Sequence, residues 1–484
     1  MSKKDKSKLK VLFITSELAG ITKTGGLGDV SYALPKALKA LRVDARVVMP
    51  FHSMLIKRPV KKILDSLIVK PGNVEIGCSI YETKIDFIQV YLVEHQIYFH
   101  RPRLYDDGVN EYPDNIERFC LLSAAALALA QKINFVPDCV HCNDWQAALA
   151  PLYLSRLKKV NSKFKKTKSL LTVHNGHFQG KHSAFYQGFL GLNEAFHMYA
   201  YEDCGHINLL KGGIFYSDYT NTVSPGYAEE LLTLGGGHGL YMAYQQKKDR
   251  FLGILNGCSY EIWNPKTDKY IAKHYSINNL ANKRHCKLDL VKQFGLKNDD
   301  TKPLIGMVSR LTEQKGFNYA IPAIYRLLAQ GIMVAVVGDG DLGLVNSFHH
   351  LKYLFPDKLI WWHGYSEEMA HKIEAGCDLF LMPSLFEPCG LNQMYSQRYG
   401  SLPLVRSVGG LKDTVRNYDI ANFQNSSGFV FDEPSAKAVY NTVMWGVDVY
   451  QNHRDKFLSV VKSAMAKRYY WRESAREYIK IYSA

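Results

Sequence analysis

Short apolar runs with the length of β-strands alternate with amphipathic runs of helical spacing along most of the chain. The runs that predict strands are Val11–Thr15, Ala45–Met49, Ser169–Val173, Leu304–Ser309, Met333–Val337, Leu359–Trp362 and Leu379–Pro383. The runs that predict helices are Ser31–Leu41, Ala320–Ala329, Ala370–Ala375 and Leu391–Tyr399. Such alternation is typical of βαβ units, in which helices cover both faces of a parallel sheet. The sequence therefore predicts the α/β class.

The alternating pattern begins twice. Val11–Thr15 is followed by a Gly-rich turn at 23–28, and Leu304–Arg310 is followed by a second turn with Lys and Gly at 313–316. We therefore expect two doubly wound, Rossmann-like domains that face each other across a cleft. Ligands of such sheets bind outside the carboxyl ends of the strands, where both turns would lie.

The predicted domains are residues 1–258, residues 259–462 and a C-terminal segment, 463–484. The first boundary is placed after Asn256-Gly257, close to the Asn-Pro turn within Trp263–Asp268. The last segment contains a predicted helix, Trp471–Ile481, with aromatic and apolar residues on one face. We expect this helix to return to the first domain.

Composition is compatible with this organisation. The 484 residues exceed one ordinary domain, and 47% hydrophobic and 22% charged residues are typical of a soluble globular protein. No apolar run reaches the roughly 18 residues that a membrane span requires. The apolar stretch behind the Lys-rich N-terminus is too short for a signal peptide. We therefore expect a cytoplasmic protein without a membrane partner.

The net charge of +15 would suit anionic partners such as sugar nucleotides, nucleic acid or acidic proteins. The basic residues are dispersed and no nucleic-acid-binding signature accompanies them, so a solvated surface is favoured and no nucleic-acid partner is expected. The nine scattered cysteines fit a reducing compartment. Cys139 and Cys142 have the spacing of a redox or zinc pair, but no second pair matches them, so packing is favoured.

The first turn, Lys23-Thr24-Gly25-Gly26-Leu27-Gly28-Asp29, has the features of an anion site. Paired glycines allow a ligand close to the backbone, and the following helix contributes its positive end. Lys23 adds a full charge, which suits a diphosphate. The spacing is neither that of a Walker A loop nor that of the dinucleotide fingerprint, so an ordinary structural turn remains the alternative.

Arg310 and Lys315 lie at the end of a predicted strand and in the turn after it. Two cations at this spacing could hold a leaving diphosphate and stabilise the charge that develops on it. An ordinary polar turn is the equal alternative.

The segment Glu387-Pro388-Cys389-Gly390-Leu391 opens a predicted helix after the strand Leu379–Pro383. The backbone N–H groups of Gly390 and Leu391 would receive a phosphate there, and the Glu387 carboxylate could accept bonds from sugar hydroxyls. Cys389 is not paired with an identifiable histidine, so packing is favoured over a nucleophilic role for its thiol.

Two further predicted strands end in polar residues. Asn143-Asp144 follows the apolar run Val136–Val140, and His174-Asn175 follows Leu170–Val173. A lone histidine at a strand end is usually structural. Five polar strand ends directed at one cleft favour a functional site instead.

Taken in order, these segments resemble the bacterial glycogen synthases and plant starch synthases, glycosyltransferase family 5, over nearly the whole chain. The segments that carry the resemblance are Lys-Thr-Gly-Gly-Leu at 23–27, Asp-Trp at 144–145, Val-His-Asn at 173–175, Val-Ser-Pro at 223–225, Leu-Asn-Gly at 255–257, Ser-Arg-Leu-Thr-Glu-Gln-Lys-Gly at 309–316, Pro-Ser-Leu-Phe-Glu-Pro-Cys-Gly-Leu at 383–391, Pro-Leu-Val-Arg at 403–406 and Gly-Gly-Leu-Lys-Asp-Thr at 409–414. Each segment is unspecific alone, and the ordered set is specific.

The resemblance implies the GT-B fold and a retaining glucosyltransferase. The enzyme would move glucose from ADP-glucose, or less often UDP-glucose, to the non-reducing end of an α-1,4-glucan. The donor would bind between the two domains, with the acceptor and sugar on the first and the nucleotide sugar on the second. No cofactor and no metal is implied, because cationic side chains take the part of a metal ion. The leaving phosphate is expected to take the acceptor's proton, so that no protein nucleophile is needed.

The resemblance also assigns roles residue by residue. The implied catalytic residues are Lys23, Asp144, His174, Arg310, Lys315 and Glu387. The implied donor-binding residues are Lys23, Gly25, Gly26, Asp29, Asn256, Arg310, Lys315, Tyr365, Cys389, Gly390 and Leu391. Within this set Arg310 and Lys315 bind the phosphates, and Tyr365 stacks on the nucleobase. His174 and Asp144 hold the transferred glucose, whose remaining hydroxyls meet Glu387.

The sequence departs from the family at several positions on the sugar and acceptor side. These are Asn143 and Gln146 in place of the usual histidines around Asp-Trp, Cys258 and Ser259 where an acidic residue is usual, the loop 235–240 without its usual acid, and His177. The departures leave open a catalytically degenerate glucan-binding or regulatory protein derived from a synthase. Sucrose synthases carry a second glutamate at the position of Tyr395, which counts against that class.

Overall fold

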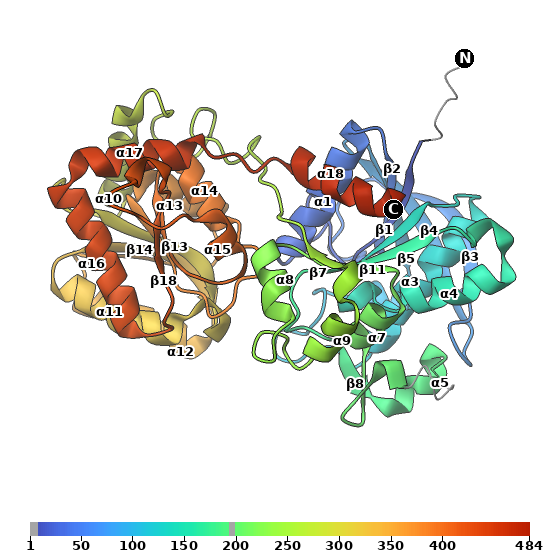
Figure 1. Cartoon of the computed structure of the whole chain (residues 1–484). Coiled ribbons are helices and arrows are strands. Elements are labelled where there is room, and N and C mark those ends of the chain that lie inside the picture. The colour runs from blue at the N-terminus through green and yellow to red at the C-terminus, as the bar shows by residue number, and fades with distance from the viewer. Residues whose placement is uncertain (1–7, 193–198) are drawn as a thin grey trace, which may run out of the picture. The chain divides into compact units, whose positions relative to one another are not determined.

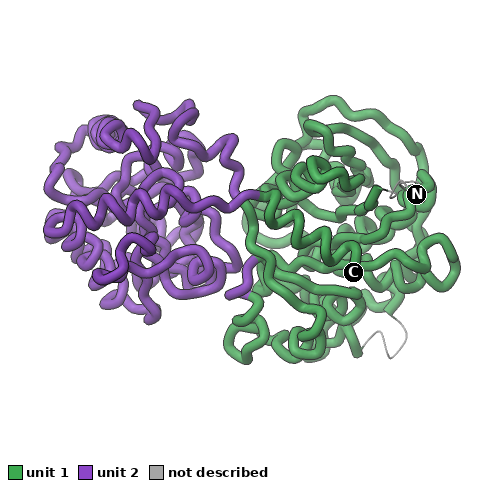
Figure 2. Tube along the Cα trace, turned by 45° about the horizontal axis from the view of Figure 1, so that its top comes forward, with its two compact units in different colours: residues 1–223, 228–257, 471–484 green, residues 224–227, 258–470 purple. Residues whose placement is uncertain are grey.

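The computed structural model describes residues 8–192 and 199–484, and its chain forms two compact units (Figures 1 and 2). Unit 1 comprises Met1–Val223, Ala228–Gly257 and Trp471–Ala484. Unit 2 comprises Ser224–Tyr227 and Cys258–Tyr470. Each unit has a mainly parallel sheet with helices on both faces, which confirms the predicted fold class.

Unit 1 is built on a nine-stranded sheet with the order β12-β11-β7-β6-β1-β2-β5-β4-β3. Its strands are β1 (Lys10–Ile14), β2 (Asp44–Pro50), β3 (Lys61–Val69), β4 (Ile76–Ile85), β5 (Ile88–Glu94), β6 (Cys139–Asn143), β7 (Lys168–Val173), β11 (Tyr219–Thr222) and β12 (Phe251–Gly253). Only the pairings of β3 with β4 and of β4 with β5 are antiparallel. A small separate sheet has the order β8-β10-β9, formed by β8 (Lys181–Ser183), β9 (Glu202–Asp203) and β10 (His206–Asn208).

The helices of unit 1 cover both faces of the large sheet. They are α1 (Gly26–Ala40), α2 (Gln96–Phe99), α3 (Asn115–Lys132), α4 (Ala150–Val160), α5 (Gln187–Leu190), α7 (Leu209–Tyr216), α9 (Tyr241–Gln246) and α18 (Trp471–Ser483), while α8 (Pro225–Leu231) has residues in both units. One core forms where α1 and α18 pack on alternate strand residues such as Val11 and Phe13. Helices α3 and α4 contact β1, β2, β6 and β7.

Helix α18 completes the core of unit 1, as predicted for the C-terminal helix (Figure 1). Its apolar face buries Trp471, Ala475 and Ile481. The Tyr482 hydroxyl lies 2.8 Å from Nδ1 of the buried His141, whose Nε2 lies 2.6 Å from the Thr172 hydroxyl. Burial keeps the pKa of His141 well below its usual value, so the imidazole is neutral.

Replacing Tyr482 with phenylalanine is expected to lower the free energy of unfolding by about 1–3 kcal/mol, because His141 Nδ1 is then buried without a partner. Urea unfolding followed by circular dichroism measures this loss. Tyr353→Phe is the control, since Tyr353 is 81% exposed. Equal stability of the Tyr482→Phe variant and the wild type would show that the hydrogen bond contributes nothing.

Unit 2 is built on a six-stranded parallel sheet with the order β15-β14-β13-β16-β17-β18. Its strands are β13 (Leu304–Leu311), β14 (Met333–Gly340), β15 (Leu359–His363), β16 (Leu379–Met382), β17 (Leu402–Arg406) and β18 (Phe429–Phe431). Numbered from β13, this is the 3-2-1-4-5-6 order of dinucleotide-binding sheets. The order reverses between β13 and β16, which is where ligands of such sheets bind.

Helices pack on both faces of the unit 2 sheet because successive strand residues point to opposite sides. The helices are α10 (Lys283–Gln293), α11 (Phe317–Ala329), α12 (Leu342–Leu354), α13 (Glu367–Gly376), α14 (Asn392–Tyr399), α15 (Gly409–Thr414), α16 (Ala436–Asn452) and α17 (Arg454–Ala466). Ile305 and Met307 pack with α11, α12, α16 and α17. Leu304 packs with α10 and α13 on the other face.

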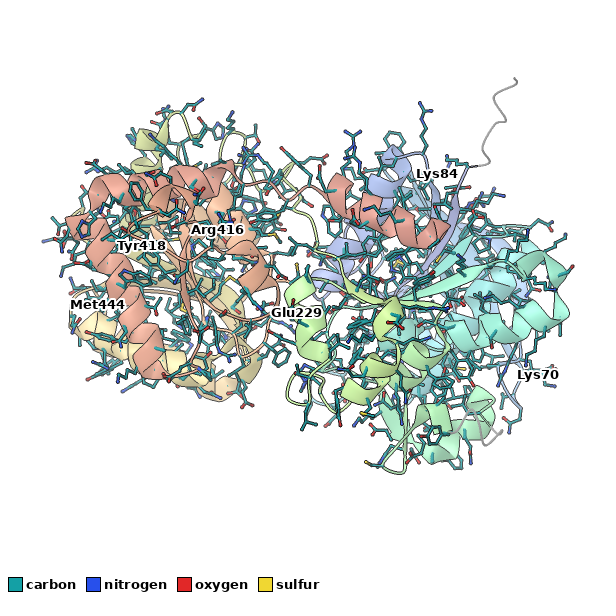
Figure 3. All side chains as sticks on the ribbon, in the orientation of Figure 1. Lys70, Lys84, Glu229, Arg416, Tyr418 and Met444 are labelled. Carbon is teal, nitrogen blue, oxygen red and sulfur yellow. The ribbon has the colours of Figure 1, made fainter. Side chains whose placement is uncertain are left out.

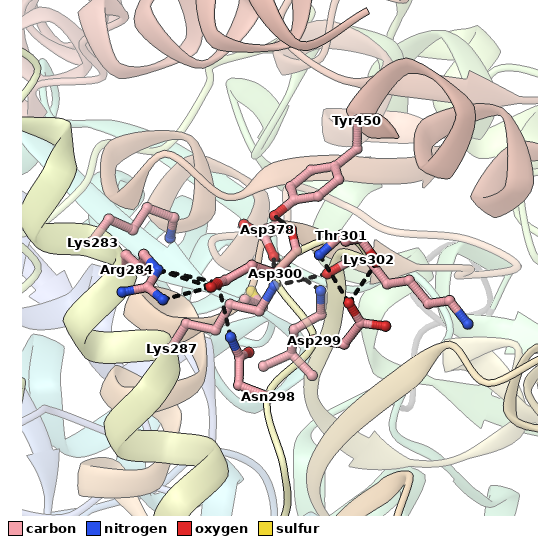
Figure 4. Close-up of polar contacts among 12 residues, drawn as sticks. Lys283, Arg284, Lys287, Asn298, Asp299, Asp300, Thr301, Lys302, Asp378 and Tyr450 are labelled. Carbon is pink, nitrogen blue, oxygen red and sulfur yellow. Dashed lines mark hydrogen bonds and ion pairs between the residues drawn. The ribbon is translucent and has the colours of Figure 1, made fainter. Parts of the chain in front are cut away.

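A buried ion pair fixes the amino end of β13 (Figure 4). Lys287 Nζ lies 2.8 Å from Asp378 Oδ2, which also accepts a bond from the Leu304 N–H at 2.9 Å. Burial by itself would lower the pKa of Lys287. The attraction to the Asp378 carboxylate is the stronger effect, so the pKa of Lys287 is raised. The Tyr450 hydroxyl of α16 donates to the Asp300 carbonyl at 3.4 Å, which places the end of α16 at this edge of the sheet.

Two predicted boundaries differ from the structure. The boundary at 462/463 falls inside α17, whose residues Val460, Val461 and Ala464 belong to one core, and the chain passes to unit 1 at Tyr470/Trp471. The strand before Asp144 is β6 (Cys139–Asn143) rather than Val136–Val140, because 139–143 pairs with β1 and β7. Cys139 and Cys142 are buried in β6 as free thiols.

Candidate active site

The predicted site residues of unit 1 follow neighbouring strands at the carboxyl edge of the sheet. Lys23 follows β1, Asp144 follows β6 and His174 follows β7, and these three strands are adjacent. Asn256 follows β12, at the far end of the same parallel run, where it is 5% exposed. The buried Asn256 Oδ1 has no hydrogen-bond partner among the residues that the structure describes.

Glu17 holds the Gly-rich turn, a role that no motif in the sequence indicates. Its carboxylate accepts bonds from the Thr24 N–H at 2.7 Å, the Gly25 N–H at 3.1 Å and the Tyr105 hydroxyl at 2.7 Å. The Gly25 N–H is therefore occupied by Glu17 in this structure. A Cβ added at Gly25 or Gly26 would meet nothing within 4 Å, so the space beside the turn is open.

Lys23 and Asp29 are brought together at the start of α1. Their Nζ and Oδ1 atoms lie 2.6 Å apart, and both side chains are about two-fifths exposed, at 43% and 39%. An exposed ion pair of this kind is weak and is easily rearranged. Lys23 therefore keeps the mobility to turn towards an anion at the N-terminus of α1.

Asp144 adopts a backbone conformation that residues with a side chain rarely adopt, with φ 54° and ψ −171°. Its Oδ1 accepts a bond from the His174 N–H at 2.6 Å, which ties the end of β6 to the end of β7. Burial raises the pKa of Asp144 to about 7, although the N–H groups of His174 and Asn175 act in the opposite direction. Strain and a shifted pKa at one residue are typical of functional sites.

Asn143 fixes which nitrogen of the His174 imidazole carries the hydrogen. Nδ2 of Asn143 donates to the Ile14 carbonyl at 2.9 Å, so its Oδ1 faces His174 Nε2 at 2.9 Å as an acceptor. Nε2 therefore carries the hydrogen and Nδ1 is left as an acceptor. Burial lowers the pKa of His174 to about 3, so the ring stays uncharged at neutral pH.

The raised pKa of Asp144 makes the stability of the protein depend on pH. A carboxyl group whose pKa is higher in the folded than in the unfolded protein favours the folded state most strongly below about pH 4. The protein loses this stability as the pH rises to about 7. The loss is at most about 4 kcal/mol, for a shift of about three pKa units. Melting temperatures of the wild type and of Asp144→Asn between pH 4 and pH 8 measure it. We expect the melting temperature of Asp144→Asn to fall less steeply between pH 4 and pH 8 than that of the wild type. The same dependence of melting temperature on pH in both proteins would contradict a raised pKa of Asp144.

In unit 2, Lys315 and Glu387 form an ion pair at the carboxyl edge of the sheet. Lys315 Nζ lies 2.6 Å from Glu387 Oε2, which also accepts a bond from the Ser384 hydroxyl at 2.9 Å. Glu387 is only 6% exposed. The two residues are 72 positions apart, and their pairing joins the turn after β13 to the loop after β16.

Gly316 makes this pairing possible. Its φ of 75° is in the left-handed region, and an added Cβ would lie 1.9 Å from the Pro383 carbonyl oxygen. Only glycine combines this conformation with so close an approach of two backbones. The turn 313–316 therefore packs directly against the end of β16.

Arg310 and Tyr365 are exposed at the same edge of unit 2. Arg310 lies in β13 opposite Asp339 of β14, and its guanidinium has no hydrogen bond or ion pair to any residue within the described ranges. Tyr365 follows β15 and is 77% exposed. A free guanidinium and an exposed ring suit a phosphate and a planar base respectively.

The turn before α14 contains the remaining predicted residues. Cys389 is 5% exposed and lies against Gly410, while Gly390 has φ 68°. The Gly410 N–H donates to the Glu387 carbonyl at 3.1 Å, which holds the turn against the start of α15. Leu391 directly precedes α14, so the turn meets the N-terminus of a helix. In the part of the chain that the structure describes, no group of three or more His, Cys, Asp or Glu side chains could hold a metal ion.

Two Rossmann-like units, each with candidate site residues at the carboxyl edge of its sheet, form the GT-B architecture of glycosyltransferases. Residues 10–246 match the family described as the starch synthase catalytic domain, and residues 291–456 match glycosyl transferases group 1. The chain belongs to the glycogen and starch synthase family.

Relatives of known name cover almost the whole chain. The glycogen synthase of Aeromonas hydrophila is 43% identical over 478 residues, with 98% of each chain covered. Glycogen synthase 1 of Geobacter metallireducens is 41% identical and covers 98% of this chain and 96% of its own. The catalytic domain of starch synthase IV from Arabidopsis thaliana, bound to ADP and acarbose, is 31% identical, with a TM-score of 0.89 and 99% of each chain covered.

The likeness confirms that the chain is a glycosyltransferase that elongates a glucan, and nothing favours a degenerate binder. A search of the helices within 8–192 and 199–484 finds none with the length and apolar character of a membrane span.

Proposed function

We propose that the chain transfers glucose from ADP-glucose to the non-reducing end of an α-1,4-glucan with retention of configuration. The observation that carries the proposal is the carboxyl edge of unit 2, where Arg310 is exposed near the end of β13 and the Lys315–Glu387 pair joins the turn after β13 to the loop after β16. Two cations there would stabilise a departing diphosphate. The family membership supports the same reaction.

The phosphates are proposed to bind to Arg310 and Lys315, with Lys23 and the open turn at Gly25 and Gly26 assisting. These cations take the part of a metal ion, and no metal or other cofactor is proposed. The leaving phosphate would accept the proton of the acceptor hydroxyl. No side chain needs to act as a nucleophile in this route.

The transferred glucose is proposed to meet His174, Asp144 and Glu387. A neutral His174 with Nδ1 as an acceptor suits an uncharged hydroxyl donor, which supports this assignment. Because Oδ1 of Asp144 is bonded to the backbone of His174, we propose that Asp144 acts largely by positioning that histidine. The backbone of Cys389, Gly390 and Leu391 would bind the remaining hydroxyls.

The donor base is proposed to stack on Tyr365, with ADP-glucose favoured over UDP-glucose. The support is the exposed ring and the ADP in the related Arabidopsis structure. The site of action is proposed to be the cytoplasm, since all nine cysteines are free and eight of them are buried.

Release of ADP or UDP in the presence of glycogen, measured with the two donors in parallel, tests the proposed donor. We expect a higher kcat/KM with ADP-glucose, and a raised KM for this donor in Tyr365→Ala with little change in kcat. Tyr353→Ala is the matched control, because it removes an exposed ring elsewhere on unit 2. A preference for UDP-glucose, or an unchanged KM in Tyr365→Ala, would overturn the assignment of the base.

A further inference from the structure

A cluster of buried polar side chains in unit 1 has hydrogen-bonding atoms without protein partners. Arg118 in the first turn of α3 and His52, two residues after β2, are both 0% exposed, and Tyr112 lies in the loop before α3. Both ring nitrogens of His52, Nη2 of Arg118 and the buried Tyr112 hydroxyl have no hydrogen-bond partner among the described residues. Buried polar atoms in native proteins are normally bonded to protein, to water or to an ion.

Ring contacts place these side chains around the Arg118 guanidinium. Its Cζ lies 5.1 Å from the centroid of the Tyr112 ring and 5.6 Å from that of Phe99. The His52 ring in turn lies edge-on to Phe99, with 5.8 Å between the ring centroids. Burial, together with the charge of Arg118, lowers the pKa of His52 to about 3. His52 is therefore neutral near pH 7, and one of its ring nitrogens is a hydrogen-bond donor.

Arg118 is a buried cation whose protein partners are neutral. Its Nε donates to the Tyr98 carbonyl at 2.7 Å, and its Nη1 donates to Asn115 Oδ1 at 2.5 Å. The acid at the start of α3, Asp114, is bonded through both carboxylate oxygens to Arg101, at 2.7 and 2.5 Å. Within residues 8–192 and 199–484, no carboxylate forms an ion pair with Arg118.

The surroundings of Arg118 lack negative charge. Burial and the charge of Arg101 lower the pKa of Arg118 to about 10, which is more than Asp114 raises it. The guanidinium nevertheless stays charged near pH 7. It also lies at the positive end of α3, where a second positive charge is unfavourable. A buried charge without a counter-charge is costly, and the surrounding rings compensate for only part of this cost.

The unpaired atoms of the cluster suit an anion. Arg118 Nη2, one nitrogen of His52 and the Tyr112 hydroxyl can all donate hydrogen bonds. Donors around a positive charge repel cations, and a bound water would leave the charge uncompensated. The remaining neighbours are the rings of Phe99 and Phe119, which could not bond to the further oxygens of a phosphate. A small, spherical, monovalent anion fits these requirements.

We propose that His52, Arg118 and Tyr112 form a buried binding site for a halide ion such as chloride. None of the three belongs to the residues proposed to bind the donor or the transferred glucose. The proposal concerns the stability of unit 1, and it does not depend on the reaction proposed for the protein.

The site is connected to the Gly-rich turn through hydrogen bonds. Asn115, which accepts from Arg118, donates through Nδ2 to the Tyr105 carbonyl at 2.9 Å. The Tyr105 hydroxyl donates to the Glu17 carboxylate at 2.7 Å, and Glu17 holds the turn. A halide that neutralises Arg118 would therefore stabilise the segment that positions Glu17.

Thermal unfolding of the full chain in sodium chloride and in sodium gluconate, at equal pH and ionic strength, tests the site. We expect the melting temperature of the wild type to be about 2–4 °C higher in chloride, with saturation as the concentration rises, and bromide to replace chloride. His52→Phe and Tyr112→Phe each remove a donor and keep a ring. Each should raise the half-saturating chloride concentration about tenfold, which is the loss of one hydrogen bond to a charged group.

Lys84→Ala is the matched control, because Lys84 is an exposed cation in β4 of the same unit and is labelled in Figure 3. This variant should respond to chloride as the wild type does. A crystal soaked in sodium bromide locates the ion directly, and we expect an anomalous bromide peak within hydrogen-bonding distance of Arg118 Nη2.

Equal melting temperatures of the wild type in chloride and gluconate would overturn the proposal. A wild-type response to chloride in His52→Phe would overturn it too, because the ion would then bind elsewhere. If His52→Phe does not fold, Tyr112→Phe decides by the same criterion. A water molecule beside Arg118 Nη2 in the bromide-soaked crystal, with no anomalous peak, would equally contradict a halide site.

Discussion

Replacing Arg310 with alanine is expected to lower kcat by about 10²–10³-fold, the loss typical of one preorganised charge stabiliser. Arg310 lies in β13 and points away from the core, and the structure shows no carboxylate among the described residues that requires its charge. Its removal should therefore cost the fold little. The effect should fall on the step in which negative charge develops on the leaving diphosphate.

The initial rate of glucose transfer to glycogen at saturating ADP-glucose measures this effect. Lys437→Ala is the control, since Lys437 is an exposed cation in α16 of the same unit. An unchanged melting temperature of Arg310→Ala would exclude a folding defect. A loss below tenfold in kcat would remove Arg310 from the catalytic residues.

Replacing Lys315 with alanine is expected to reduce kcat by a similar factor of about 10²–10³. It also leaves Glu387 buried without its cation, because the two side chains are 2.6 Å apart and Glu387 is 6% exposed. Removing one member of a buried pair is costly, so the melting temperature of the variant should fall as well. Glu387→Gln should reduce kcat through the lost charge and the altered hydrogen bonds to sugar and to Lys315.

The double variant Lys315→Ala/Glu387→Gln separates these contributions. Residues in direct contact act as a unit, so we expect its loss in kcat to be smaller than the product of the two single losses. Its melting temperature should lie above that of Lys315→Ala, because no unpaired charge remains. Fully multiplicative losses in kcat, or a fully active Glu387→Gln variant, would show that the pair does not act as one element of the site.

The positions of the site residues could be predicted because they follow from local patterns. Apolar runs such as 304–309 and 169–173 have the length and residue types of strands, and they pair in the sheets as β13 and β7. The residues directly after a parallel strand must lie at its carboxyl edge. Arg310 and His174 therefore reach the edges of their sheets for reasons that the sequence contains.

The partners of these residues could not be predicted, because they depend on contacts between distant segments. Glu17 resembles an ordinary polar residue after a strand, and only the folded turn shows its bonds to Thr24 and Gly25. Asn143 fixes the hydrogen on His174 through a bond to Ile14, 129 positions away.

The strained backbone of Asp144 is a further feature without a sequence signal. A positive φ is expected of glycine, and asparagine and aspartate adopt it more often than other residues, but most aspartates do not. Here the conformation turns the carboxylate back to the N–H groups after β7. Burial then raises its pKa to about 7, which the residue type alone does not indicate.

Incorporation of labelled glucose from ADP-glucose into glycogen, followed by digestion of the product with an enzyme specific for α-1,4 linkages, tests the central claim most directly. The account predicts that the wild type incorporates label, that the label is released by the digestion, and that Arg310→Ala and Lys315→Ala each incorporate it at least tenfold more slowly. A folded wild-type protein that binds glycogen but incorporates no label from either ADP-glucose or UDP-glucose would contradict it.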